Sequence, residues 1–66
     1  MNRVTIEAVY DKYSNLTSLV DVAEVRTRLI MRSMEVAPLK AFLVNGVDIL
    51  PMKSTELDNF LMFLGE

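Results

Sequence analysis

The sequence contains no cysteine, no histidine and no tryptophan among its 66 residues, and it has only two glycines and two prolines. Cysteine and histidine are the usual ligands of structural zinc, and their thiol and imidazole groups serve many nucleophilic and acid–base sites. Their absence excludes zinc sites of this kind, disulfide bonds and thiol redox chemistry. The remaining carboxylates, lysines, tyrosines and hydroxyl groups form no recognisable catalytic pattern. We therefore expect neither an enzyme nor a bound cofactor.

Neither sign of charge is in large excess. Seven Lys and Arg residues oppose nine Asp and Glu residues, which gives a net charge of −2. A chain that neutralises several phosphates is usually basic, so this balance disfavours a nucleic-acid partner. No apolar run approaches the ~20 residues of a membrane span, and residues 1–13 lack the pattern of a signal peptide. We expect a cytoplasmic protein with no membrane partner and no small-molecule substrate.

The length of the chain allows one small domain, over residues 1–66. A chain of this size buries only about 60% of the surface that its unfolded state exposes. Hydrophobic residues nevertheless make up 52% of the sequence, and no disulfide is available to compensate for a small core. We therefore expect apolar contacts between chains, in a homodimer.

Residues 2–10 alternate between polar and apolar types, which predicts a half-buried strand. The apolar positions are Val4, Ile6, Ala8 and Tyr10. A polar stretch follows, and Ser18, with Asp21 three residues later, predicts the start of a helix that runs to about Ser33 or Met34. One arc of this helix is apolar and holds Leu19, Val22, Ala23, Val25, Leu29 and Ile30. The opposite side holds Asp21, Glu24, Arg28 and Arg32.

The strongest local pattern is Asn45-Gly46 between two apolar runs, which predicts a type I′ hairpin over residues 41–50. This turn pairs Val44 with Val47, and Pro51 ends the second strand. Ser54 is expected to cap a final helix that stops at Gly65. The core side of that helix contains Leu57, Phe60, Leu61 and Leu64.

These elements predict a small α/β domain of the order β-α-β-β-α. A helical connection between strands is normally a right-handed crossover, so the first two strands should be parallel and the third antiparallel. We expect a three-stranded mixed sheet with an Asn-Gly hairpin and two helices. The pattern leaves open whether the helices cover one face of this sheet or both.

Arg26 falls inside the apolar arc of the first predicted helix. Burial of an unpaired guanidinium is costly. Arg26 should therefore pair with a carboxylate such as Glu7 or Glu35, extend its head into water, or face another chain.

Several apolar residues lie off the predicted core faces. Met62 and Phe63 are on the wrong side of the last helix, and Leu43 and Leu50 are on the second face of the hairpin. If both helices pack on one sheet face, the other face is left for a partner. The candidate protein-binding residues are Arg26, Leu43, Leu50, Met62 and Phe63.

The favoured interpretation is a non-enzymatic protein-interaction module, a homodimeric small regulator, inhibitor or accessory subunit of a larger protein. The alternative is a small nucleic-acid-binding regulator that uses the basic residues Arg28, Arg32 and Lys40, with Tyr13 stacking on bases. The nearby Asp21 and Glu24 count against a purely basic patch on the first helix.

Overall fold

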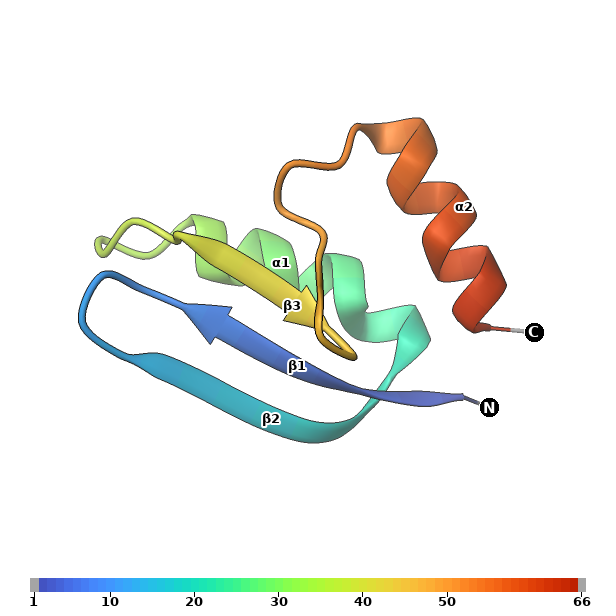
Figure 1. Ribbon diagram of the computed structural model, residues 1–66, viewed down its shortest axis with the longest axis horizontal. Coiled ribbons are helices and arrows are strands. Elements are labelled where there is room, and N and C mark those ends of the chain that lie inside the picture. The colour runs from blue at the N-terminus through green and yellow to red at the C-terminus, as the bar shows by residue number, and fades with distance from the viewer. Residues whose placement is uncertain (1, 66) are drawn as a thin grey trace.

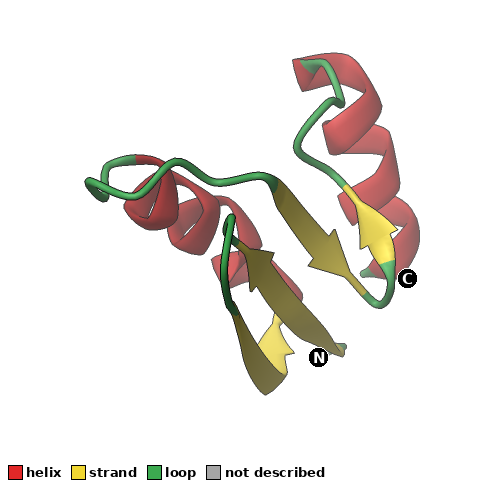
Figure 2. Ribbon diagram, turned by 60° about the vertical axis from the view of Figure 1, so that its left-hand side comes forward, coloured by secondary structure: helices red, strands yellow, loops and turns green. Residues whose placement is uncertain are grey.

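A computed structural model describes residues 2–65 and shows two β-hairpins, each followed by a helix (Figure 1). The elements are β1 (Arg3–Val9), β2 (Ser14–Asp21), the 3₁₀ turn η1 (Val22–Glu24), α1 (Val25–Ser33), β3 (Ala41–Val44), β4 (Val47–Asp48) and α2 (Ser54–Leu64). The strands form one four-stranded sheet in the order β2-β1-β3-β4, and every neighbouring pair is antiparallel (Figure 2). The α/β class is confirmed, whereas the three-stranded mixed sheet is corrected to four antiparallel strands.

The first predicted strand is confirmed as β1. Its apolar positions Val4, Ile6 and Ala8 are buried, while Thr5 and Glu7 between them are half-buried. The alternation places one set of side chains in the core and the other on the opposite face of the sheet. Tyr10, directly after β1, continues the buried set.

The predicted helix start at Ser18 is wrong, because residues 14–21 form the edge strand β2. β1 and β2 join through a tight turn in which the Tyr10 amide donates to the Tyr13 carbonyl at 2.8 Å. The turn residues Asp11 and Lys12 have negative φ angles, so they need no Asn or Gly and leave no sequence signature of the turn. The extra strand reverses the chain once more, which is why β3 runs antiparallel to β1 instead of parallel.

A β-bulge hides the strand character of β2 in the sequence. Val4 pairs with Val20 and Ile6 pairs with Thr17, so Thr5 alone opposes both Ser18 and Leu19. Leu19 adopts a left-handed φ of 59° and is exposed, not in the apolar arc of a helix. The extra residue shifts the period-two alternation out of phase, and the sequence of β2 then resembles a helix start.

The first predicted helix is confirmed from Val25 onward. The Asp21 side chain accepts a hydrogen bond from the Ala23 amide at 3.0 Å and caps η1, so the cap is Asp21 and not Ser18 as predicted. Val25 is completely buried and Leu29 packs against the core, but Ile30 is exposed. α1 ends at Ser33, as predicted.

The Asn45-Gly46 hairpin is confirmed. Asn45 and Gly46 have φ angles of 51° and 85°, which match the two central positions of a type I′ turn. Val44 pairs with Val47, and the Asn45 amide donates to the Thr5 carbonyl at 2.8 Å. The Asn45 side chain also accepts from the Thr5 amide at 2.9 Å, so the turn is fixed to β1 as well as to its own strands.

The last helix is confirmed with a small shift at its start. Ser54 is the first helical residue and not the cap; the Glu56 carboxylate accepts from the Lys53 amide at 3.4 Å. Leu57 is buried, and the core side also holds the half-buried Phe60, Leu61 and Leu64. The Gly65 amide donates to the Leu61 carbonyl at 3.0 Å and closes the last turn.

Both helices pack on the same face of the sheet. Val25 of α1 and Leu57 of α2 belong to one buried cluster with Ile6, Phe42 and Val44. The β1–β3 pairing places Ile6 beside Val44 and so on a single sheet face. No helix within residues 2–65 therefore covers the opposite face, and this decides the alternative that the sequence pattern left open.

Candidate protein-binding surface

The uncovered face of the sheet, here called the open face, is built around one row of side chains that crosses all four strands. Leu16 of β2 pairs with Glu7 of β1, Glu7 pairs with Leu43 of β3, and Leu43 pairs with Asp48 of β4. Directly opposed residues on neighbouring strands point to the same side of a sheet. Apolar and acidic side chains therefore alternate across the row.

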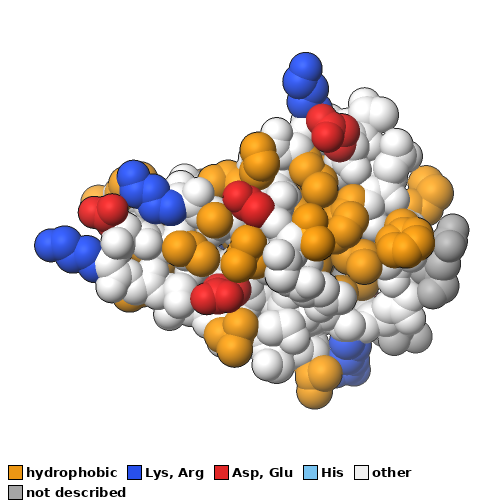
Figure 3. Space-filling model, viewed as in Figure 1, with side chains coloured by type: hydrophobic (Ala, Val, Ile, Leu, Met, Phe, Trp, Pro, Cys, Tyr) orange, Lys and Arg blue, Asp and Glu red, His pale blue; other side chains and the backbone are white. Residues whose placement is uncertain are grey.

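Further apolar side chains widen this row. Val9 pairs with Ala41 one row further along, and both are half-buried. Leu16 is 65% exposed and Leu50 is 37% exposed. The space-filling view shows hydrophobic side chains gathered over the sheet and α2, with acidic groups among them (Figure 3). Exposed apolar side chains gathered in this way on a small protein are typical of a binding site.

Asp48 fixes the edge of the open face. Its Oδ1 atom accepts from the Phe42 amide at 3.1 Å and from the Leu50 amide at 3.0 Å. The Ile49 amide donates to the Phe42 carbonyl at 2.9 Å, as in a regular strand pair. The Phe42 amide donates to the Asp48 carboxylate and not to the backbone of Ile49. β4 ends at Asp48 for this reason, and the same carboxylate holds the backbone of Leu50.

Two other predicted binding residues lie on α2. Met62 and Phe63 are 67% and 69% exposed, off the core side of the helix as predicted. They belong to a different element from Leu43 and Leu50 and form an exposed apolar pair of their own. The structure thus places Leu43 and Leu50 near Asp48 in the second hairpin, and Met62 and Phe63 on a separate helix.

Arg26 pairs with neither Glu7 nor Glu35. Its guanidinium forms an ion pair with Asp58 of α2, and the Arg26 side chain is 43% exposed. Glu7 lies on the open face, on the other side of the sheet from α1. Arg26 therefore links the two helices and does not belong to the open face.

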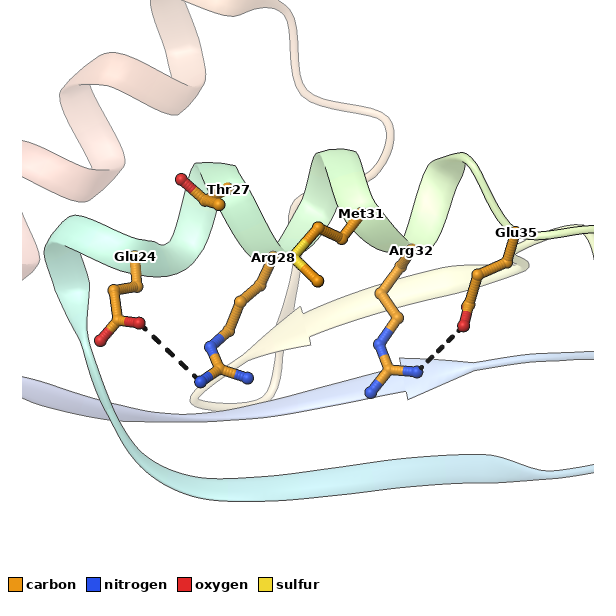
Figure 4. A pocket seen from close by; sticks show the side chains of 6 residues that line it. All are labelled: Glu24, Thr27, Arg28, Met31, Arg32 and Glu35. Carbon is orange, nitrogen blue, oxygen red and sulfur yellow. Dashed lines mark hydrogen bonds and ion pairs between the residues drawn. The ribbon is translucent and has the colours of Figure 1, made fainter.

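The remaining arginines of α1 line a shallow groove of about 360 Å³ (Figure 4). Its lining residues are Glu24, Thr27, Arg28, Met31, Arg32 and Glu35. Arg28 lies 3.9 Å from Glu24, and Arg32 lies 3.5 Å from Glu35. Two carboxylates thus face two guanidinium groups, and the groove is not the free basic patch that phosphate binding requires.

Tyr10 contacts Glu35, one of the residues that line this groove. Its phenol donates a hydrogen bond to Glu35, and this bond together with burial raises the pKa of Tyr10 above its ordinary value of 10.0. Tyr13 stacks on Tyr10 with ring centroids 4.7 Å apart. One ring face of Tyr13 is therefore occupied inside the protein. Lys40 follows the α1–β3 loop, and its amide donates to the Val9 carbonyl at 2.7 Å.

Three members of the open face are not among the binding residues that the sequence predicts. They are Glu7, Leu16 and Asp48. Leu16 lies in the polar stretch before the predicted helix, and no local signal marks its neighbours on other strands. Only strand pairing aligns these residues in one row.

Within residues 2–65, no group of three or more Asp or Glu side chains is placed to hold a metal ion. No helix in the described part of the chain is long and apolar enough to cross a membrane. No family model, no curated protein and no solved structure matches this chain.

Proposed function

We propose that this chain is a non-enzymatic protein-interaction module, a homodimeric accessory or inhibitory subunit that docks on a larger protein through the open face of its sheet. The observation that carries the proposal is the row Leu16, Glu7, Leu43 and Asp48 on a face with no helix over it. Apolar side chains at the centre of an interface supply most of its binding free energy.

The charges of the open face indicate the chemistry of the larger protein. Glu7 and Asp48 flank Leu43 on both sides, and no basic side chain stands between them in the row. Two copies of this face packed on each other would bring like charges together. A partner surface with apolar groups and Lys or Arg side chains fits both features.

The ion pairs of α1 favour this function over nucleic-acid binding. Arg26, Arg28 and Arg32 each have a carboxylate partner. Phosphate contacts would have to displace these partners, in a chain whose net charge is −2.

Site-specific photo-crosslinking in the native cells tests the proposal. A photoreactive amino acid replaces Leu43 in one variant and Asn59, exposed on α2, in a matched control. We expect a defined crosslink to one larger protein from position 43 and none from position 59. Equal crosslinking from the two positions, or none from position 43, would refute docking through the open face.

A charge reversal adds a second readout. Glu7→Lys should weaken the crosslink from position 43 by about tenfold, which corresponds to ~1.4 kcal/mol of binding free energy. Asp11→Lys changes the net charge equally but lies in the β1–β2 turn, so it should leave the crosslink unchanged.

A further inference from the structure

β2 is a free edge of the sheet. In the described part of the chain, β1 lies on one side of β2 and no strand lies on the other, while α2 follows the chain at the β4 side (Figures 1 and 2). An edge strand presents unpaired backbone groups that can accept another strand. The question is which strand fits this edge.

The hydrogen-bond pattern shows which backbone groups of β2 are free. The Tyr10 amide bonds to the Tyr13 carbonyl, so these two residues form a hydrogen-bonded pair. Hydrogen-bonded and non-hydrogen-bonded pairs alternate along an antiparallel ladder. The pair Ala8–Asn15 is therefore hydrogen-bonded. The pairs on either side of it, Val9–Ser14 and Glu7–Leu16, are not.

Consequently, the backbone groups of Ser14 and Leu16 point away from β1. The hydrogen bonds of β1 on its other side agree with this pattern. The Val9 carbonyl accepts from the Lys40 amide, so Val9 does not hydrogen-bond its pairing partner Ser14 through this group. The N–H and C=O groups of these two residues of β2 thus lie along the free edge, before the bulge at Ser18 and Leu19 ends the regular segment.

This edge carries few of the features that usually prevent strand pairing. β2 has eight residues, contains no proline, and its only charged residue is Asp21 at the far end. The opposite edge is different, because β4 has two residues, includes Asp48 and is soon followed by Pro51. Charges, proline and short length protect an edge, and β2 is protected only by its bulge.

We infer that β2 pairs antiparallel with β2 of a second copy, with Leu16 opposite Leu16 at a twofold axis. In this register Ser14 opposes Ser18 of the second copy, and Asn15 opposes Thr17. Every opposed pair is uncharged, and the amide of Asn15 can hydrogen-bond the hydroxyl of Thr17 across the junction. The two sheets then join into one continuous sheet.

The same register gives a partner to each large apolar side chain that β2 and its turn leave exposed. Leu16 is 65% exposed and meets its own copy. Tyr13 and Leu19, 55% and 69% exposed, become opposed to each other across the junction. The strained φ of Leu19 presents an apolar side chain to the second copy at the point where the strand pairing ends.

This inference rests on the self-association in the proposed function, but it uses the edge of β2, and Leu16 is the one residue of the open-face row that takes part in it. The full chain is studied by sedimentation equilibrium over a concentration series. Leu16→Pro removes an outward N–H that β1 does not use, so a proline is compatible with this edge position. Leu16→Lys places two like charges together at the twofold axis. Either change should raise the dimer dissociation constant by about 100-fold or more.

Leu43→Lys is the matched control, because it adds the same charge on the open face and should leave the dimer intact. Circular dichroism and the amide NMR spectrum report whether each variant is folded. If Leu16→Pro does not fold, Leu16→Lys decides the outcome.

A crosslink tests the register directly, since the chain has no native cysteine. Opposed Cα atoms in a hydrogen-bonded antiparallel pair are about 5.5 Å apart, within the range of about 4.4–6.8 Å that a disulfide spans. Oxidation of Leu16→Cys should give a covalent dimer, and oxidation of Leu43→Cys should not.

Three results would overturn the inference. One is a dimer that Leu16→Pro and Leu16→Lys leave unchanged, and another is a monomer at all concentrations. The third is a dimer that only Leu43→Lys disrupts, which would move self-association to the open face. The crosslink from position 43 to a larger protein tests the proposed function separately in each case.

Discussion

The phenol of Tyr10 donates a hydrogen bond to the carboxylate of Glu35, and this bond joins the end of β1 to the residues that follow α1. Arg32, in the last turn of α1, lies 3.5 Å from the same carboxylate. Glu35 therefore holds the C-terminal end of the helix against the sheet at a point 25 residues away along the chain.

Alkaline pH should weaken this contact. The hydrogen bond to Glu35 and the burial of the ring both favour the protonated phenol, so the pKa of Tyr10 is above 10.0 in the folded chain and near 10.0 in the unfolded chain. The stabilisation is complete below pH 10 and is lost as the pH rises through the folded-state pKa. A tyrosinate absorbance titration in the Tyr13→Phe background, where Tyr10 is the only tyrosine, measures this value.

Glu35→Gln provides the control for the titration. The amide can still accept the hydrogen bond but carries no negative charge, so the pKa of Tyr10 should move back toward 10.0. An unchanged pKa would show that Glu35 is not the main cause of the shift.

The Asp48 carboxylate should stabilise the second hairpin. Asp48→Ala removes the acceptor of both the Phe42 and the Leu50 amides. We expect the free energy of unfolding to fall by about 1–3 kcal/mol, because hydrogen bonds to charged groups contribute about 1.5–3 kcal/mol. Urea denaturation measures the loss, and hydrogen exchange of the Phe42 amide should accelerate.

Asp48→Asn keeps one oxygen acceptor and should cost less than Asp48→Ala. Asp11→Ala removes a carboxylate from the exposed β1–β2 turn and should change stability by less than about 0.5 kcal/mol. Equal effects of Asp48→Ala and Asp11→Ala would contradict a structural role for Asp48.

The ion pair between Arg26 and Asp58 should contribute little to stability. The Arg26 and Asp58 side chains are 43% and 61% exposed, and exposed pairs typically give about 0.2–1 kcal/mol. A double-mutant cycle with Arg26→Ala and Asp58→Ala should give a coupling free energy in this range that decreases with added salt. A coupling well above ~1 kcal/mol that salt leaves unchanged would show that the pair acts as a buried link between the helices.

Two phenylalanines of α2 should respond oppositely to the same substitution. Phe60 packs against the core, so Phe60→Glu should destabilise the fold by about 3 kcal/mol or more. Phe63 is mostly exposed, and Phe63→Glu should leave the unfolding free energy nearly unchanged. Thermal unfolding followed by circular dichroism compares the two variants. Unfolding of the Phe63 variant would place this residue in the core and remove it from the candidate binding residues.

Local patterns predicted well wherever the physical cause was local. The alternation in β1, the Asn45-Gly46 turn and the apolar side of α2 all depend on residues within a few positions of one another. Glu24 and Arg28 also lie together as their spacing on one helix turn indicates. Each of these features could be derived without knowing the rest of the fold.

The predictions failed where hydrogen bonds from distant residues decided the local structure. β2 is a strand because β1 pairs with it, through a turn without glycine and across a bulge at Leu19. The bulge disrupts the alternation that would have identified the strand. The partner of Arg26 was also missed, because Asp58 comes close only when α2 packs beside α1.

By itself, the sequence determined the absence of thiol and imidazole chemistry, one core strand, the type I′ hairpin and the core side of the last helix. These features depend on residue chemistry and on short-range periodicity. Only the tertiary structure decided the fourth strand, the antiparallel order β2-β1-β3-β4 and the placement of both helices on one face. Strand pairing and the choice of sheet face are settled by contacts between distant segments, and these contacts also align Leu16, Glu7, Leu43 and Asp48 on the open face.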